Sequence, residues 1–399
     1  MKFNIWNDYK YMDLPDVLSF IVDNRGKTVP IDENGSHILI ATNCIRNENL
    51  YPSYEKIRKL NEETYQTWFR AHPEPGDIIF VNKGTPGRVC MVPDPVDFCI
   101  AQDMMAFRVN SEIVYNKYLF AVLRSKKIQN QIAATTVGDV IPHFKKQHLY
   151  EIKIPIPPMN IQKVIGDYYF LFCQKEVINK NINRNLQEQA HAIFKSEFLE
   201  FSSIPHGWKQ GSLLDIADYL NGLAMQKFRP AEDEEGIPVL KIKELRQGRC
   251  DANSELCSQN IKSEYIVHDG DVIFSWSGSL LVDFWCGGEC GLNQHLFKVS
   301  SKQYDKWFYY SWTLYYLDRF IAVATDKATT MGHIKREELA KAKVLIPPFD
   351  EYRRIGKLLE PIYNMVISNR IENKKLSKLR DKLISKLMSG DLDVLELNL

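Results

Sequence analysis

The feature that most constrains the fold is a duplication that spans the chain. The sequence GDIIF at Gly76 recurs as GDVIF at Gly270, 194 positions later, and the sequences TTVG and TTMG recur at the same spacing. Solenoids and propellers repeat every 20 to 50 residues, whereas a spacing of this size requires two copies of a whole domain. The sequence therefore predicts two domains of similar fold, each of about 150 residues.

A second repeat contains paired prolines. The sequence IPIPPMNIQKVIG begins at Ile154, and VLIPPFDEYRRIG begins at Val344, 190 positions later. Because proline is excluded from helix interiors and biases the preceding residue towards extended conformation, each motif predicts the end of a strand and the start of a helix. A long helical pattern follows each motif, with no proline from Met159 to Ile204 and only Pro361 in the second copy.

These repeats divide the chain into four predicted segments. They are a first domain over residues 1–153, a first helical region over 154–200, a second domain over 201–343 and a second helical region over 344–399. Inside both domains, strand-like runs such as SHILIATNCI and IPVLKIKEL alternate with Gly, Pro and Asn turns and with short helical stretches. The predicted fold class is a duplicated mixed α/β domain, with a long α-helix after each copy.

Both helical regions carry apolar residues at alternating spacings of three and four, which is the pattern of a coiled-coil seam. The two stripes contain Asn179 and Asn369 at equivalent places, followed by Leu186 and Leu376. A polar seam residue weakens a coiled coil but fixes its register and partner. The sequence therefore predicts that the two long helices pair with each other.

The composition indicates the compartment of the protein and the state of its cysteines, but it does not indicate a function. No run of 18 apolar residues occurs in the 399-residue chain, and the N-terminus lacks the features of a signal peptide, so we expect a cytoplasmic protein with no membrane partner. The eight cysteines are scattered, which favours reduced thiols over a disulfide framework. The net charge is only +1, so any surface for nucleic acid must come from local clusters.

Three catalytic chemistries would each require a recognisable set of residues in the sequence. The chain has no Gly-rich cofactor loop with an Asn/Asp-Pro-Pro-aromatic tetrad and no GxxxxGK[ST] phosphate loop. The strongest nuclease candidate is Asp94 with Glu151 and Lys153, since two carboxylates and a lysine could hold Mg²⁺ and activate water. The second copy has Lys341 and Lys343 at the matching places, so a solvated strand edge is favoured and no catalytic residue is predicted.

The second domain contains several residues that could in principle be zinc ligands. Cys286 and Cys290 in CGGEC have a possible ligand spacing. Further candidate ligands are Cys250, Cys257, His268 and His295. The first domain has no counterpart, and isolated cysteines are most often small buried residues, so no metal site is predicted.

The order of several motifs resembles the specificity (S) subunits of type I restriction-modification systems. The motifs are IPHGWKQGSLLDIADYL and GDVIFSWSGS in the second domain, the TTVG and TTMG pair, the two Pro-Pro helix starts, NRNLQEQAHAIFKSEF, and LRDKLISKLMSGDLDV. Together they cover essentially the whole chain. The family usually has Glu-Gln after the proline motif, where this chain has Ile161-Gln162 and Glu351-Tyr352.

The resemblance implies that each domain is a target-recognition domain reading one half of a split double-stranded DNA sequence. It implies that the two helices pack as an antiparallel coiled coil, and that the chain directs two methyltransferase subunits and two ATP-dependent restriction subunits to the site. It also implies a non-catalytic chain with no cofactor of its own, while S-adenosylmethionine, ATP and Mg²⁺ are bound by the partner subunits.

DNA readout requires Arg, Lys, Asn or Gln on loops that can reach base edges, with further cations on phosphates. The candidates in the first domain are Arg25, Lys27, Asn43, Arg46, Lys83, Arg88, Lys145 and Lys146. The candidates in the second are Lys227, Arg229, Lys241, Lys243, Arg246, Lys327 and Lys335. After the shared GDxIF strand, Asn82-Lys83 matches Trp276-Ser277, and such divergence is what two different half-sites would require.

Two rival functions remain open at this point. The first is a self-sufficient endonuclease or nicking enzyme built on paired DNA-binding domains, which would cleave plasmid with Mg²⁺ and no partner. The second is a structural partner-binding protein without DNA specificity, which competition against random duplex at a stated salt concentration would reveal.

Overall fold

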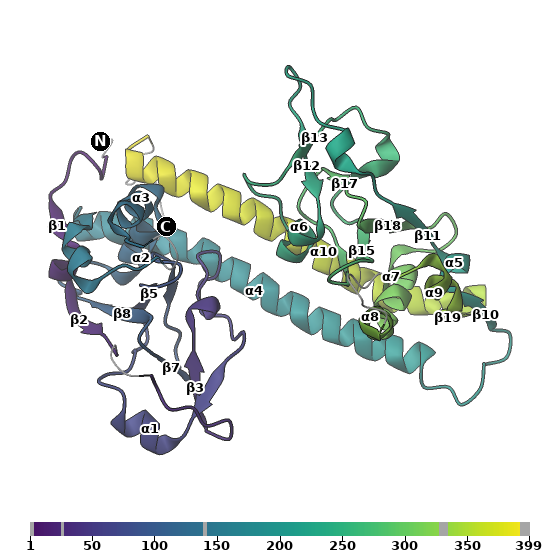
Figure 1. The fold of residues 1–399 in the computed structure, drawn as a ribbon, viewed down its shortest axis with the longest axis horizontal. Helices are drawn as coiled ribbons and strands as arrows, with labels where there is room; N and C mark the ends of the chain where they lie inside the picture. The colour runs from purple at the N-terminus through teal and green to yellow at the C-terminus, as the bar shows by residue number, and fades with distance from the viewer. Residues whose placement is uncertain (1–3, 25–27, 139–141, 327–333, 392–399) are drawn as a thin grey trace. The chain divides into compact units, whose positions relative to one another are not determined.

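The computed structural model describes residues 4–24, 28–138, 142–326 and 334–391, and the chain divides into two units (Figure 1). The first unit consists of Met1–Ile178 and Leu376–Leu399, and the second of Asn179–Lys375. Each unit therefore contains one domain copy together with parts of both long helices. No helix within the four described ranges is long and apolar enough to cross a membrane.

The first unit contains a four-stranded sheet in the order β2-β8-β5-β6 and a three-stranded sheet in the order β4-β3-β7. The first sheet is formed by β2 (Leu18–Val22), β8 (Met104–Val109), β5 (Ile78–Val81) and β6 (Val89–Met91). The second is formed by β4 (Arg58–Leu60), β3 (His37–Ile40) and β7 (Phe98–Ile100). A separate antiparallel pair joins β1 (Tyr11–Asp13) to β9 (Lys153–Pro155).

The second unit repeats this topology with one further strand, β14, in its second sheet; the strand orders are β11-β18-β15-β16 and β13-β12-β17-β14. The first sheet consists of β11 (Asp218–Asn221), β18 (Leu296–Ser300), β15 (Val272–Ser275) and β16 (Leu281–Phe284). The second consists of β13 (Leu256–Cys257), β12 (Ile237–Leu240), β17 (Cys290–Leu292) and β14 (Ile266–Val267). The pair β10 (Lys209–Ser212) and β19 (Lys343–Ile346) matches β1 and β9. The predicted duplication and the mixed α/β class are confirmed.

Short helices connect the strands in both units. In the first they are η1 (Leu14–Val17), η2 (Thr42–Cys44), α1 (Glu62–Thr67), α2 (Asn116–Arg124), α3 (Lys126–Thr135) and η3 (Lys146–Glu151). In the second they are α5 (Leu213–Ile216), η4 (Met225–Lys227), α6 (Ile242–Gln247), η5 (Ser263–Tyr265), α7 (Lys306–Tyr315), α8 (Leu317–Asp326) and α9 (Arg336–Lys341). The helices α2 and α7 supply much of the apolar core of their units, since six of the nine residues of α2 and seven of the ten residues of α7 are buried.

The two proline motifs each end a strand and precede a long helix, as predicted. Strand β9 ends at Pro155 and α4 runs from Met159 to Phe198, while β19 ends at Ile346 and α10 runs from Phe349 to Ser389. The end of α10 belongs to the core of the first unit, because Ile384, Leu387 and Met388 pack against its buried apolar side chains. The carbonyl of Met388 also accepts a hydrogen bond from the backbone N–H of Ile5, at 3.0 Å.

The buried face of the long helices differs from the predicted seam by one residue in several places. Asn179 and Asn369 are buried as expected, and Leu186 and Leu376 are half-buried. In the wider stripes, however, Ile182 and Leu379 are exposed, whereas the next residues, Asn183 and Arg380, are buried. At the start of α4, Ile165, Tyr169 and Cys173 lie in the core of the first unit and are spaced by four residues rather than by alternating threes and fours. At Asn183 and Arg380 the residue one position after the predicted stripe therefore faces inward, while Asn179 and Asn369 keep their predicted places.

Gln162 and Tyr352, which stand where the family usually has the Gln of its Glu-Gln pair, have a shared structural role. The side chain of Gln162 accepts a hydrogen bond from the backbone N–H of Tyr115, the residue before α2, at 2.8 Å. At the matching place in the second unit, the hydroxyl of Tyr352 accepts from the backbone N–H of Asp305, the residue before α7, at 2.7 Å. Both contacts join the start of a long helix to the start of the helix packed against it. Gln162 also donates to the carbonyls of Ile113 and Pro157.

The glycine eight residues beyond each proline pair allows close helix packing in the first unit. A Cβ at Gly166 would lie 2.6 Å from the backbone N of Tyr118, whereas a Cβ at Gly356 would lie 3.1 Å from Nε1 of Trp307. Backbone cannot move aside as a side-chain atom can, and overpacking of this kind costs about 1–3 kcal/mol.

We expect Gly166→Ala to lower the free energy of unfolding by about 2 kcal/mol, although alanine is the better helix former by about 1 kcal/mol. Gly356→Ala is the matched control, and its propensity gain should offset most of the milder contact with Trp307. Urea unfolding of both variants provides the measurement. Equal effects at the two positions would contradict the close-packing explanation.

Candidate nucleic-acid interface

The topology brings several loops of the first unit to one edge of the sheets. Strands β2 and β5 both run antiparallel to β8, so their carboxyl ends meet at the edge where β8 begins. Strand β7 is parallel to β3 and leads through residues 101–103 into β8 at the same edge. We name residues 23–24, 82–88, 101–103 and 142–146 the first loop edge. Loops at the ends of a rigid sheet are frequent binding sites.

Four of the predicted DNA-binding residues lie on the first loop edge, namely Lys83, Arg88, Lys145 and Lys146. Nζ of Lys83 is 3.8 Å from a carboxylate oxygen of Asp103, and Nζ of Lys146 is 3.5 Å from one of Asp23. Lys145 is exposed and, within the described ranges, has no carboxylate partner. Arg25 and Lys27 lie outside the described residues.

Asn43 and Arg46 follow strand β3 and contact a neighbouring loop. The amide of Asn43 donates to the carbonyl of Glu55 at 2.5 Å, and the Arg46 guanidinium pairs with the Glu55 carboxylate at 2.5 Å. In the free protein, both side chains therefore contact the same residue, Glu55. Whether they contact DNA stays a prediction.

The second unit has an equivalent edge, because β11 and β15 are both antiparallel to β18 and β12 is parallel to β17. We name residues 222–229, 241–246, 276–280, 293–295 and 334–335 the second loop edge. The predicted residues on it are Lys227, Arg229, Lys241, Lys243, Arg246 and Lys335. Lys327 lies outside the described residues.

One carboxylate, that of Glu255, pairs with two cations of the second loop edge. Glu255 pairs with Lys241 at 2.5 Å and with Arg229 at 3.3 Å. The hydrogen bond from Lys241 holds the pKa of Glu255 below its usual value. Lys243 is 3.6 Å from Asp251, whereas Lys227, Arg246 and Lys335 are exposed. Exposed ion pairs contribute about 0–1 kcal/mol, so a phosphate group could replace these carboxylates as the partner of the cations.

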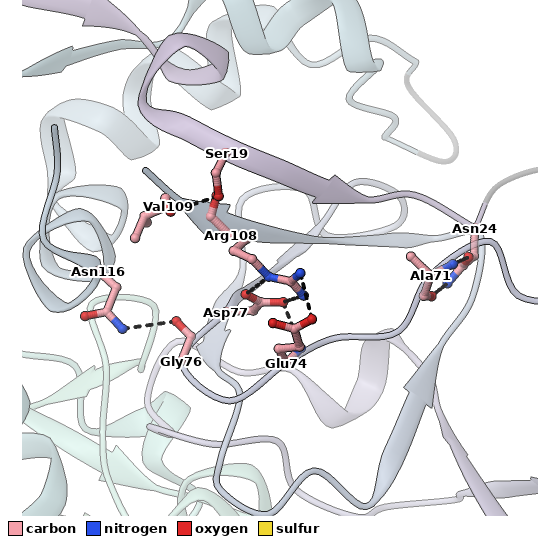
Figure 2. Close-up of polar contacts among 9 residues, drawn as sticks. All are labelled: Ser19, Asn24, Ala71, Glu74, Gly76, Asp77, Arg108, Val109 and Asn116. Atoms are coloured by element: carbon pink, nitrogen blue, oxygen red, sulfur yellow. Dashed lines mark hydrogen bonds and ion pairs between the residues drawn. The ribbon is translucent and has the colours of Figure 1, made fainter. Parts of the chain in front are cut away.

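Figure 2 shows two polar clusters of the first unit. Their residue types also suit DNA binding, so the sequence alone does not show that their role is structural. Asn24 is 3% exposed, and its amide donates to the carbonyls of Ala71 and Ile100 and accepts from two backbone N–H groups. Its hydrogen-bonding capacity is used within the fold, so Asn24 is a structural residue. Asn24 directly precedes Arg25, a predicted DNA-binding residue, and nothing in the sequence distinguishes its structural role from a binding role.

The second cluster explains the acidic residue of the GDIIF motif. Asp77 is buried and accepts two hydrogen bonds from the Arg108 guanidinium, at 3.1 and 3.0 Å, while Glu74 pairs with the same guanidinium at 2.8 Å (Figure 2). In the second unit, Asp271 pairs with Lys298 at 2.9 Å. The motif therefore supplies an anion that pairs with a cation on the adjacent strand.

The nuclease and zinc candidates are not assembled into a metal site. Lys153 pairs with Asp13 at 2.5 Å. Sγ of Cys250 lies 3.4 Å from Sγ of Cys290, and all eight cysteines are free thiols. Over the portion of the chain that the structure describes, no group of three or more His, Cys, Asp and Glu side chains could hold a metal ion.

Comparison with known proteins places this chain in a family. The model of the type I restriction modification DNA specificity domain matches residues 7–188 and again residues 205–380. The chain is 24% identical over 354 residues to the type I restriction enzyme MjaIX specificity subunit of Methanocaldococcus jannaschii, covering 81% of this chain and 79% of the relative. It is 24% identical over 328 residues to the EcoKI specificity subunit of Escherichia coli K12, covering 70% and 66% of the two chains.

A solved structure supports the fold. The S subunit of a type I restriction-modification system from M. genitalium has a TM-score of 0.56 with 15% identity, covering 97% of this chain and 98% of that one. The chain thus belongs to the family of type I restriction-modification DNA specificity subunits, and it is a DNA sequence-recognition subunit. The resemblance inferred from the sequence motifs is confirmed, and a self-sufficient nuclease is not favoured.

Proposed function

We propose that this chain reads a split double-stranded DNA sequence, with residues 1–153 recognising one half and residues 201–343 the other. The observation that carries the proposal is the duplicated topology, in which each copy presents cations and amides on loops at the same edge of its sheets. Phosphate contacts by exposed cations position a protein on DNA, while side chains that reach base edges give specificity. The divergence of the loops between the copies supports two different half-sites.

We further propose that the regions 154–200 and 344–399 pack as an antiparallel coiled coil that sets the spacing between the half-sites. Residues further along α4 contact residues earlier in α10, which is the order of contacts in an antiparallel pair of helices. Within the first unit Glu176 contacts Arg380, and within the second Asn183 contacts Asn369. Asn179, which was predicted to fix the register, donates to Glu372 at 2.6 Å and to Asn373 at 2.8 Å.

The chain would act by recruitment rather than by its own chemistry. We propose that it directs two methyltransferase subunits and two ATP-dependent restriction subunits to the recognised site, in the cytoplasm. S-adenosylmethionine, ATP and Mg²⁺ would be bound by those partners and not by this chain. The family membership supports this arrangement, and purified chain incubated with plasmid and Mg²⁺ should leave the plasmid intact.

Domain replacement tests the reading model. Exchanging residues 1–153 for the corresponding domain of another family member should change one half of the recognised sequence and leave the other half and the spacer unchanged. The sites methylated by the complex in a host genome give the readout, and exchange of residues 201–343 is the matched experiment. A change in both halves, or in neither, would exclude one-domain-per-half recognition.

A further inference from the structure

The turns after strands β5 and β15 are equivalent by strand register as well as by sequence. Val81 pairs with Met104 at the end of β5, and Ser275 pairs with Leu296 at the end of β15. The residues that follow β5 and β15 are therefore equivalent, 82–84 in the first unit and 276–278 in the second. The residues that precede β8 and β18 are likewise equivalent, 102–103 and 294–295. We name residues 82–84 and 102–103 the first notch, and residues 276–278 and 294–295 the second notch.

Some parts of the notches are shared. Gly84 and Gly278 occupy the same place in the turn with φ of +82° and +64°. A Cβ at Gly84 would meet nothing within 4 Å, and one at Gly278 would meet only Ile242 Cδ1, at 3.7 Å. Each turn therefore presents its backbone to open space. Gln102 and Gln294 form a second shared element, since both lie two residues before the matched strands β8 and β18.

Other parts differ between the notches. In the first, Lys83 and Asp103 form a half-exposed ion pair at 3.8 Å. At the matching positions of the second, Oγ of Ser277 lies 3.0 Å from Nδ1 of His295. Both pairs lie beyond the ends of the strands, so the sheets do not require them. The chemistry at these positions has changed while the backbone around it has been retained.

The first notch also contains amides without hydrogen-bond partners. The side chain of Asn82 is fully buried, and neither its oxygen nor its nitrogen is hydrogen-bonded within the described ranges. Oε1 of the half-buried Gln102 is likewise buried without a partner. An unpaired buried polar group costs about 1–3 kcal/mol. Gln102 is half-buried, so turning its amide towards a ligand with donors and acceptors would recover that cost, whereas the amide of Asn82 is enclosed by the fold.

Cations lie beside both notches in equivalent positions. The backbone N–H of Phe144 donates to the carbonyl of Asn82 at 2.7 Å, and that of Ile334 donates to the carbonyl of Trp276 at 2.9 Å. The next residues, Lys145 and Lys335, are both exposed. Each notch thus has an exposed lysine beside an open turn and a glutamine, although the amide of Gln294 also lies 3.4 Å from Nε2 of His295. Cations that contact phosphates next to side chains that can reach base edges are typical of a base-reading site.

We propose that the two notches are the base-reading sites of the two domains, and that Gln102 and Gln294 each recognise an adenine. This inference rests on the proposed function and adds which residues read bases. A glutamine recognises adenine through two hydrogen bonds, since Oε1 accepts from the N6 amino group and Nε2 donates to N7. The pairs Lys83–Asp103 and Ser277–His295 then give the two half-sites their different neighbouring bases.

The test uses the chain assembled with its methyltransferase subunits and a library of random duplexes. A carboxylate in place of the amide accepts from the cytosine amino group instead of pairing with adenine, so Gln102→Glu should exchange one A·T for C·G in one half-site. Binding to the original sequence should fall roughly ten- to a hundredfold. Gln294→Glu should do the same in the other half-site only.

Gln174→Glu, an exposed position on α4, is the matched control and should leave the selected sequence unchanged. The double variant Lys83→Ser/Asp103→His gives a second, independent change of base preference in the first half-site if Gln102→Glu does not fold. Unchanged base preference in both folded notch variants would overturn the inference while the proposed function stood. If the wild-type complex itself selected no split sequence, the proposed function would fail instead.

Discussion

Replacing Arg380 with alanine is expected to lower the free energy of unfolding by about 3–5 kcal/mol. The Arg380 side chain is 8% exposed and pairs with the equally buried carboxylate of Glu176 at 3.0 Å. It also donates to Ser377 and lies over the ring of Tyr169 at 5.4 Å. Removing the guanidinium takes away the cation that pairs with the Glu176 carboxylate, while the carboxylate stays largely buried. Urea unfolding followed by circular dichroism measures the effect.

The chain contains a matched control for this prediction. Arg354 and Glu197 form a second Arg–Glu contact between the same two helices, with two hydrogen bonds, but the arginine is 50% exposed. Exposed pairs contribute less than about 1 kcal/mol, so Arg354→Ala should have little effect. The double variant Glu176→Leu/Arg380→Met should recover most of the stability lost in Arg380→Ala. Equal losses at positions 354 and 380 would show that burial does not govern these pairs.

Replacing Gln162 with leucine is expected to cost about 3–5 kcal/mol, because it leaves three buried or partly buried backbone groups without this hydrogen-bond partner. The amide is 1% exposed and bonds to the N–H of Tyr115 and the carbonyls of Ile113 and Pro157. Leucine has a similar volume, so the loss reports the hydrogen bonds rather than a cavity. Thermal unfolding together with amide hydrogen exchange at Tyr115 gives the measurement.

The equivalent change in the second unit should be milder. Tyr352→Phe removes only the hydroxyl that accepts from the exposed N–H of Asp305, and water can replace that acceptor. We expect a loss of about 1 kcal/mol or less. The prediction would be wrong if Tyr352→Phe destabilised the protein as much as Gln162→Leu does.

The order of the elements follows from local signals in the sequence. Proline restricts its own backbone and that of its neighbour, so the two Pro-Pro motifs locate both strand ends and both helix starts without tertiary information. The duplicated GDxIF strands likewise fix the middle of each sheet, because a period of whole-domain size leaves few topologies. The order of the motifs along the chain resembles that of type I specificity subunits, and this resemblance indicated a DNA-recognition function.

Side-chain roles that depend on tertiary contacts could not be read in the same way. The core residues at the start of α4, such as Tyr169, are spaced by four residues, and a one-residue offset in a long helix is invisible in a pattern of threes and fours. Gln162 and Tyr352 perform the same task with different chemistry, so sequence alignment marks them as a mismatch. Asn24 and Gln102 look alike in the sequence, yet one amide is saturated and the other has an unpaired oxygen.

The placement of the last helical turns affects the order in which the protein can be completed on the ribosome. The core of the first unit includes Ile384, Leu387 and Met388, which follow the whole second domain in the sequence. The first domain therefore lacks part of its apolar core until the second domain and most of α10 have been synthesised. The second domain has all its residues beforehand, since its unit ends at Lys375. A nascent chain that stops short of α10's final turns would carry an open apolar surface on its first domain.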